Sequence, residues 1–386
     1  MSIKTADVIV VGGGIIGSSI AYHLACRHIS VLLFEERAPA AGSSGGCDGA
    51  VLLQSKKHGL HLQMAIASIK RFAELDEHLP VPIEFERHGS MIVIEHEVES
   101  EPMRSFVSQQ QKHGVDVSFL NVAEARELVP ELSENIVGAT FSPNDGKINP
   151  IRLNLAFIQG AKQRGAQVMV GETVEHIEII EGKVCGISTS RGTYSCKILV
   201  NAAGALAPKI GRMVNIDVPI KPRRGQILVT QAVEPLARCC MLSAGYIAAK
   251  FNPEIAHQSG HGVSIDQTAK GNILIGSTRE FVGYNRQTTF AGMAKIASRA
   301  RQIIPRLGTL DVIRSFAGLR PYTPDGLPIL GSVEALEGFI MAAGHEGDGI
   351  ALSPITGELI AQLIADEEPS ISLEPFNLSR FADRGL

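Results

Sequence analysis

The sequence is poor in aromatic residues: it has no tryptophan, and Phe, Trp and Tyr together make up 5% of its 386 residues. This scarcity argues against an aromatic cage for a quaternary amine, because such a cage needs several rings around one cation. Cysteine is also sparse, with six residues scattered along the chain in no CxxC pair and no metal-ligand spacing. The spacing predicts no metal site, and reduced thiols are typical of a cytoplasmic protein.

Basic clusters and long apolar runs are missing as well. The net charge is −4 and there is no block of Lys and Arg, which argues against a nucleic-acid partner. No apolar run reaches the length of a membrane span, and the apolar N-terminal stretch has no basic region or cleavage site that would mark a signal peptide. A chain of this length predicts two domains, or one large domain with an insertion.

Glycine, by contrast, is clustered near the start. The apolar strand 7–11 leads into Gly12, Gly14 and Gly17, which have the GxGxxG spacing, and an amphipathic helix follows. A second apolar strand, residues 29–35, ends in Glu35, whose carboxylate can accept hydrogen bonds from a ribose. This βαβ context predicts a dinucleotide site with the helix N-terminus directed at the phosphates. A glycine-rich turn without a ligand is the structural alternative.

Three later stretches place small residues where a ligand would approach. The loop 42–50 is rich in Gly and Ser, which suits an anion. The strand 197–201 ends in the small-residue turn 202–204. The strand 338–343 is followed by a Gly-rich loop, residues 344–350, and by a helix from about 351 to 365. A second helix N-terminus is therefore predicted to face the ligand, where it would stabilise negative charge on an electron-accepting ring.

The remaining segments lack the alternation of strands and helices that is typical of βαβ units. Residues 85–140 and 218–316 are rich in strand patterns, with residues 85–94 read as a pair of strands and residues 246–250 as one strand. We expect these segments to form an inserted domain that covers a cofactor and shapes a substrate pocket.

The motifs occur in one order along the chain: the GxGxxG fingerprint, the loop 42–44, the turn 200–204, residues 318–321 with Asp325 and Gly331, and residues 344–350. Together they resemble the FAD-dependent amine and D-amino-acid oxidase (DAO) family, which includes glycine oxidase and sarcosine oxidase. The likeness spans nearly the whole chain. Within the family, the stretch around Gln267, residues 271–272 and residues 275–281 looks most like the flavoprotein β subunits of proline, hydroxyproline and opine dehydrogenases.

The resemblance implies an α/β fold of the glutathione-reductase-like flavoprotein type. In this fold a Rossmann-like FAD-binding domain carries an inserted, mostly antiparallel β-sheet substrate domain. The FAD-binding domain would take residues 1–84, 141–217 and 317–386, and the substrate-binding domain would take residues 85–140 and 218–316.

The resemblance also implies an extended FAD. We expect it to be non-covalent, because no cysteine stands near residues 319–321, the region that carries the flavin-linking cysteine in sarcosine-oxidase-like monomers. The implied cofactor-binding residues are Gly12, Gly14, Ile15, Ile16, Gly17, Glu35, Glu36, Arg37, Ser43, Ser44, Gly49, Ala50, Val51, Val174, Ala202, Ala203, Gly204, Gly318, Gly344, His345, Glu346, Gly347, Asp348, Gly349 and Ile350.

Three residues are implied for catalysis. Arg320 matches the arginine that clamps a substrate carboxylate in glycine-oxidase-like members, and a planar guanidinium suits that task. Tyr246 matches a tyrosine that helps to bind the same carboxylate. His345 is a candidate base on the substrate side. The structural alternatives are an Arg320 that satisfies loop carbonyls, a His345 with a main-chain role, and Glu346 and Asp348 as caps of the following helix.

The function implied is the oxidation of an amino acid or secondary amine of proline, hydroxyproline, sarcosine, glycine or opine type. Hydride would pass from Cα to the flavin to give the imine, and electrons would pass to a partner subunit or carrier. An oxygen-using oxidase that makes hydrogen peroxide, a hydroxy-acid dehydrogenase, and an FAD-binding subunit without its own substrate site remain alternatives. The expected partners are a small amino- or imino-acid substrate and other subunits of a hetero-oligomeric dehydrogenase.

Overall fold

A six-stranded sheet made of segments far apart in the sequence forms one half of the protein. The computed structural model describes residues 4–251 and 262–384. Neighbouring strands of this sheet run parallel, except that β19 is antiparallel to β20. Their order is β19 (Ile329–Ser332), β20 (Phe339–Ala343), β13 (Ile198–Asn201), β2 (Val8–Val11), β3 (Val31–Glu35) and β9 (Gln167–Val170).

Both faces of this sheet are buried, which explains why its strands are continuous apolar runs. On β2, Val8 and Val10 pack toward the helices, whereas Ile9 and Val11 pack toward a second, smaller sheet. The helices are α1 (Ile15–Cys26), α2 (Leu60–His78), α5 (Pro150–Gln163) and α10 (Gly349–Ile364). The smaller sheet contains β1 (Lys4–Thr5), β12 (Gly192–Ser195), β11 (Lys183–Thr189) and β10 (Val174–Ile180), and α6 (Ala207–Met213) lies on the same side.

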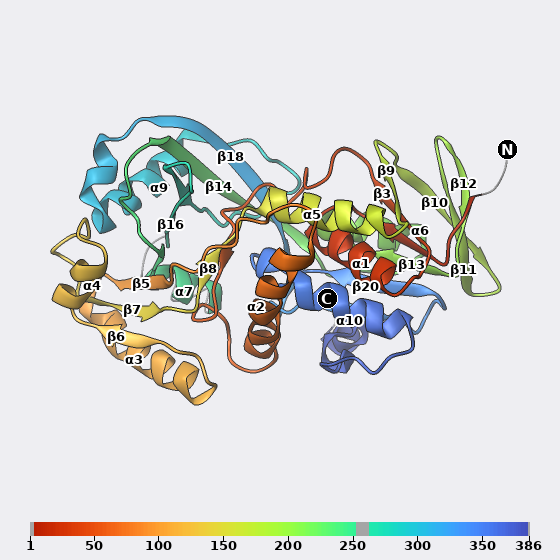
Figure 1. Cartoon of the computed structure of the whole chain (residues 1–386), viewed down its shortest axis with the longest axis horizontal. Helices are drawn as coiled ribbons and strands as arrows, with labels where there is room; N and C mark the ends of the chain where they lie inside the picture. Colours follow the sequence, from red (N-terminus) through yellow and green to blue (C-terminus); the bar gives the residue numbers. More distant parts are fainter. Residues whose placement is uncertain (1–3, 252–261, 385–386) are drawn as a thin grey trace.

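An eight-stranded sheet forms the other half of the protein, on the left of Figure 1. Its neighbouring strands are antiparallel except for β15 and β5, which run parallel. Its order is β18 (Val312–Tyr322), β14 (Lys221–Ala232), β17 (Asn272–Gly276), β16 (Ser264–Gln267), β15 (Cys240–Ser243), β5 (Ser90–Ile94), β7 (Gly138–Ser142) and β6 (Ser118–Leu120).

Helices cover both faces of this sheet. One face packs against α4 (Val122–Leu128) and α9 (Phe290–Ile303), and the other against α3 (Glu97–Lys112) and α7 (Ala244–Phe251). A short ladder of β4 (Ala50–Val51) and β8 (Gly146–Lys147) pairs the segment after the Gly- and Ser-rich loop with the segment before α5. Short 3-10 turns complete the chain: η1 (Gly204–Leu206), η2 (Pro305–Thr309), η3 (Glu374–Phe376) and η4 (Leu378–Arg384).

The fold class expected from the sequence is confirmed: a Rossmann-like α/β sheet is joined to a mostly antiparallel one. The domain boundaries stay a prediction, and the expected boundary between residues 316 and 317 falls inside the continuous strand β18. No helix in the described part of the chain has the length and apolar character that would let it cross a membrane.

Two expected elements are wrong. Residues 85–94 contain one strand, β5, which begins at Ser90, and a single bridge between Glu86 and Lys147 before it, rather than a pair of strands. Residues 246–250 lie in the helix α7 rather than in a strand. The Ser243 hydroxyl accepts a hydrogen bond from the Tyr246 amide at 3.2 Å, as an N-cap residue does. This serine was the local signal for a helix start.

Candidate active site

The GxGxxG turn joins β2 to α1 on the wall of a cavity of about 550 Å³. Gly12 has a φ of 113°, and a Cβ there would lie 2.6 Å from the Ala202 carbonyl oxygen, so the turn requires glycine. No side chain caps the helix at Gly14, but the Ser44 hydroxyl accepts a hydrogen bond from the Ile15 amide at 2.9 Å. Because other amides of a first helical turn lack intrahelical partners, this end of α1 suits an anion.

Glu35 is held in place at the end of β3. Its Oε2 accepts a hydrogen bond from the Gly13 amide at 2.8 Å, and its Oε1 accepts one from the Arg37 amide at 2.9 Å. Each carboxylate oxygen can accept a further bond, and Glu35 lines the cavity. The main chain therefore orients a carboxylate that is available to a ribose.

Most of the residues expected from the sequence meet at this cavity. Those on its lining are Gly12, Gly14, Ile15, Ile16, Glu35, Glu36, Arg37, Ser43, Ser44, Val174, Ala202, Ala203, Gly204, Tyr246, Gly318, Arg320, Gly344, His345, Glu346, Gly347, Gly349 and Ile350. Those off the lining are Gly17, Gly49, Ala50, Val51 and Asp348. Gly17 instead packs the helix on the turn, and Ala50 and Val51 form β4.

The Gly-rich loop after β20 brings a second helix N-terminus to the cavity. Gly344 has a φ of 89°, and Gly349 begins α10 on the lining. Asp348 occupies the N-cap position of α10, but its side chain makes no cap hydrogen bond, so the structural alternative of a side-chain cap is wrong. Its carboxylate instead pairs with the buried Lys56 ammonium and lies 3.2 Å from His61 Nε2. Buried partners for Asp348 keep the first turn of α10 free to face a ligand.

Glu346 is likewise no cap of α10. Its carboxylate pairs with Arg223 on β14 and also accepts the Gly347 amide. Burial would raise the pKa of Glu346, but Arg279, Arg223 and Arg320 outweigh this effect and lower it to about 2. Glu346 is therefore ionised on the cavity wall.

Arg320 lies on the lining at the end of β18. Its Nη1 donates to the Thr278 carbonyl at 3.0 Å and its Nη2 donates to the Ser277 hydroxyl. A guanidinium has more donors than these two bonds use, so Arg320 can satisfy a loop carbonyl and still bind a ligand. Tyr246 lines the same cavity from α7 rather than from a strand. The centroid of its ring lies 4.4 Å from the guanidinium carbon of Arg279.

Gly225 is a residue of the site that sequence reasoning missed. A Cβ at this position would lie 2.4 Å from Arg320 Nη1, so the absence of a side chain on β14 leaves room for the guanidinium. A glycine inside a strand often marks such a close approach, and this was the available signal. Other lining residues outside the expected set include Glu172, Lys209, Ser277, Tyr284 and Arg286.

His345 is buried, with 3% of its surface exposed, and its Nε2 lies 3.1 Å from the Thr356 hydroxyl. Burial lowers the pKa of His345 to about 3, although Asp348 acts in the opposite direction. The imidazole is therefore neutral at neutral pH, and it meets the cavity as a hydrogen-bonding group. This protonation state favours a structural role over that of a base that titrates near neutrality.

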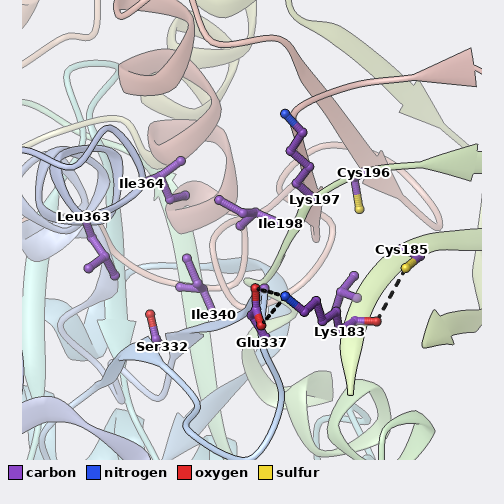
Figure 2. A pocket seen from close by; sticks show the side chains of 12 residues that line it. Lys183, Cys185, Cys196, Lys197, Ile198, Ser332, Glu337, Ile340, Leu363 and Ile364 are labelled. Atoms are coloured by element: carbon purple, nitrogen blue, oxygen red, sulfur yellow. Dashed lines mark hydrogen bonds and ion pairs between the residues drawn. The ribbon is translucent and has the colours of Figure 1, made fainter. Parts of the chain in front are cut away.

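A second cavity, of about 590 Å³, lies at the amino ends of β13 and β20. Its lining combines apolar side chains with an ion pair between Lys183 and Glu337 and with the thiols of Cys185 and Cys196 (Figure 2). The C-terminal residues of α10, Leu363 and Ile364, face it. It has neither a helix N-terminus nor a residue of the GxGxxG turn on its lining.

The first cavity fits an extended dinucleotide. Two helix N-termini, a turn that a Cβ would fill, and an oriented carboxylate line it on the side of the six-stranded sheet. Arg320 and Tyr246 line it on the side of the eight-stranded sheet. This combination of fold and cavity is typical of a dinucleotide-dependent oxidoreductase.

The model of one family, FAD-dependent oxidoreductase (DAO), matches residues 7–363, and the chain belongs to this family. Its cofactor is FAD. Hydrogen cyanide synthase subunit HcnC of Pseudomonas aeruginosa is 29% identical, over 98% of this chain and 97% of that protein. Glycine oxidase of Geobacillus kaustophilus is 30% identical, over 97% of each chain. The crystal structure of L-proline dehydrogenase from P. horikoshii has a TM-score of 0.90 and 27% identity, with 100% of both chains covered.

Proposed function

We propose that the protein oxidises an amino acid or secondary amine to its imine, with Arg320 holding the substrate carboxylate. The observation that carries this proposal is the position of the Arg320 guanidinium, on the cavity lining and above Gly225. A planar guanidinium binds a carboxylate through two parallel charge-assisted bonds. The names of similar proteins, glycine oxidase and L-proline dehydrogenase, support an amino-acid substrate.

The residues of the chain act mainly by orientation and electrostatics. Arg320 and Tyr246 fix the carboxylate, so the Cα–H bond faces the cofactor. FAD held along the GxGxxG turn and the start of α10 would supply the two-electron acceptor for the hydride of Cα. The substrate nitrogen would then form the C=N bond of the imine with its lone pair and lose its proton. The N-terminus of α10 lies where it stabilises negative charge, and the buried walls exclude water until the imine leaves and is hydrolysed.

The inference of non-covalent FAD has a test of its own, because Cys47 lines the cavity. Burial raises the pKa of the Cys47 thiol to about 12, so the reactive thiolate is scarce at neutral pH. Acid precipitation of the holoenzyme is therefore expected to release all of the flavin into the supernatant. Flavin that stays with the pellet would contradict this inference.

We infer that electrons pass to a partner subunit or carrier, as the likeness to dehydrogenase β subunits implies. The alternatives are an oxidase that uses oxygen, and an FAD-binding subunit whose substrate site lies elsewhere in a complex. Reduction of an artificial dye without hydrogen peroxide supports the dehydrogenase. Stoichiometric peroxide supports the oxidase, and bound FAD that no substrate reduces supports the subunit without a site.

The experiment that tests the role of Arg320 is substitution with a matched control. Arg320→Ala is expected to lower kcat/KM for carboxylate-bearing amines by about 10²-fold, the scale of a lost buried charge pair. Arg320→Lys should recover part of this loss, because it keeps the charge but not the planar fork. Arg314→Ala is the control, since Arg314 is exposed on the same strand. An unchanged kcat/KM in Arg320→Ala would remove Arg320 from this role.

A further inference from the structure

Three guanidinium groups surround one carboxylate beside the FAD cavity. Arg223 on β14 and Arg320 on β18 are directly opposite in the antiparallel ladder. Arg223 Nη2 bonds Glu346 Oε1, and the same oxygen lies 3.8 Å from Arg279 Nη1 and 4.0 Å from Arg320 Nε. Like charges placed directly opposite on neighbouring strands are destabilising, so this arrangement needs a reason.

The charges of this cluster do not balance. Three arginines and one glutamate leave three minus one, or two, positive charges among these residues. The neighbouring carboxylate of Asp348 is matched by the buried Lys56 ammonium. The side chains of Arg223, Arg279 and Glu346 are 10%, 14% and 7% exposed, so water screens the excess poorly.

Two donors of the cluster also lack partners. Arg223 Nε and Arg279 Nη1 are buried without a hydrogen bond. Buried polar atoms are nearly always paired, and an unpaired one near a binding site points to a group that arrives with a ligand. Tyr246 and Glu346, which contact Arg279, both line the cavity. Arg223 and Arg279 are themselves off the lining, and Glu346, which is on the lining, contacts both of them.

The backbone of the loop 344–350 is strained at Glu346, the carboxylate of the cluster. Glu346 has a φ of 50°, in the left-handed region that disfavours residues with a side chain. The loop thus holds a carboxylate among the three arginines despite a backbone cost. A single further carboxylate, bound by Arg320, would still leave one positive charge unmatched.

We propose that the substrate of this enzyme carries two carboxylates: an iminodicarboxylate, or an amino acid with an acidic side chain. Arg320 holds the carboxylate next to the reacting Cα, Arg279 and Arg223 hold the second one, and Glu346 is the shared counterion that keeps the guanidinium groups together. This inference rests on the proposed function, because it assigns the substrate class of the same site. The two carboxylates match the two excess charges and the two open donors when the substrate nitrogen is in the neutral amine form that reacts.

The test compares substrates that differ by one carboxylate, using the holoenzyme and an artificial dye. Iminodiacetate against sarcosine, and both enantiomers of glutamate against norvaline, are the pairs. We expect kcat/KM to favour the dicarboxylate by about 10²-fold, the scale of a desolvated charge pair. Equal use of both members, a preference for the monocarboxylate, or reduction by glycerol 3-phosphate instead of the amines would overturn the proposal.

Variants then connect the preference to the cluster. Arg279→Gln should reduce the ratio of kcat/KM for iminodiacetate over sarcosine by about 10²-fold. Arg279→Lys should keep part of the ratio, and the exposed Arg314→Gln should keep all of it. A proportional loss with both substrates in Arg279→Gln would show a structural role only and would contradict the assignment.

A binding measurement separates this inference from the proposed function. Malonate, succinate and glutarate are titrated into the holoenzyme, and the change in flavin absorbance is compared with that from monocarboxylates of equal length. At least one dicarboxylate is expected to bind about 10²-fold more tightly, and Arg279→Gln should remove the difference. If no amine reduces the flavin but dicarboxylates still bind more tightly than monocarboxylates, the proposed reaction is wrong and the dicarboxylate site is supported. If dicarboxylates and monocarboxylates bind equally, the dicarboxylate site is wrong.

Discussion

The two cavities are nearly equal in volume, about 550 and 590 Å³, and lie at opposite ends of the same parallel strands. The cavity at the carboxyl ends of β13 and β20 meets the N-termini of α1 and α10, whereas the cavity at the amino ends meets the last turn of α10 (Figure 2). Strand direction therefore decides which cavity receives free amides and positive helix ends. Volume alone does not distinguish the cavity that we propose for FAD from the other one.

The largest expected effect is a loss of FAD affinity. It is measured by replacing one glycine of positive φ by alanine at each cavity. Gly12→Ala at the first cavity would bring a Cβ within 2.6 Å of the Ala202 carbonyl oxygen, and Gly338→Ala at the second within 2.4 Å of the Lys197 carbonyl oxygen. Both glycines have positive φ, so both variants should lose stability. Only Gly12→Ala moves the turn that we propose as part of the cofactor site. Only this variant is therefore expected to bind FAD about 10²-fold more weakly, through the loss of charge-assisted hydrogen bonds.

Isothermal titration of FAD into the folded fraction of each apoprotein measures this difference. A loss of FAD affinity in Gly338→Ala equal to that in Gly12→Ala would break the distinction between the two cavities.

A second comparison uses one ion pair close to each cavity. Lys56→Met removes a buried partner of Asp348 at the start of α10 and is expected to lower the free energy of unfolding by about 3–5 kcal/mol. Lys183→Met breaks a pair whose side chains are 57% and 66% exposed and is expected to cost less than about 1 kcal/mol. Urea unfolding with excess FAD measures both. Equal losses of unfolding free energy in the two variants would show that the buried Lys56–Asp348 pair stabilises the protein no more than the exposed Lys183–Glu337 pair.

A further expected effect is a dependence of stability on pH. The pKa of His345 falls from an ordinary value of 6.5 to about 3 on burial, so between these values the unfolded chain binds a proton that the folded chain does not. Stability therefore falls as the pH drops through this window, by about 1.4 kcal/mol per pH unit from this group. His345→Gln should reduce the slope by that amount in urea unfolding between pH 4 and 6. An unchanged slope would show that His345 is protonated in the folded protein.

Local patterns led to the residues that are predicted for the cofactor side of the site, and most of them line one cavity. The GxGxxG turn, Glu35 and the loop around Gly344 are each specified within a few residues, because turns and helix starts depend on nearby backbone geometry. The helix α7 was missed because Ser243 was not recognised as its N-cap. That error changed the element that carries Tyr246 but left Tyr246 at the cavity.

The charged partners of the site could not be predicted in the same way. Lys56 and Asp348 are 292 residues apart, and Arg223 and Glu346 are 123 residues apart. No local period links such residues, so only the tertiary fold reveals these pairs. Arg320 was found through the family resemblance, whereas the crowding around Arg320 follows from the register of β14 and β18.

Anaerobic reduction of the bound flavin tests the central claim most directly. The purified holoenzyme is mixed without oxygen with D- and L-proline, hydroxyproline, sarcosine, glycine, iminodiacetate, opines and glutamate, and its flavin absorbance is followed. We expect at least one amine to bleach the flavin, and Arg320→Ala to require about 10²-fold more of it. A protein that binds no flavin, or a bound flavin that no amine reduces, would contradict the account.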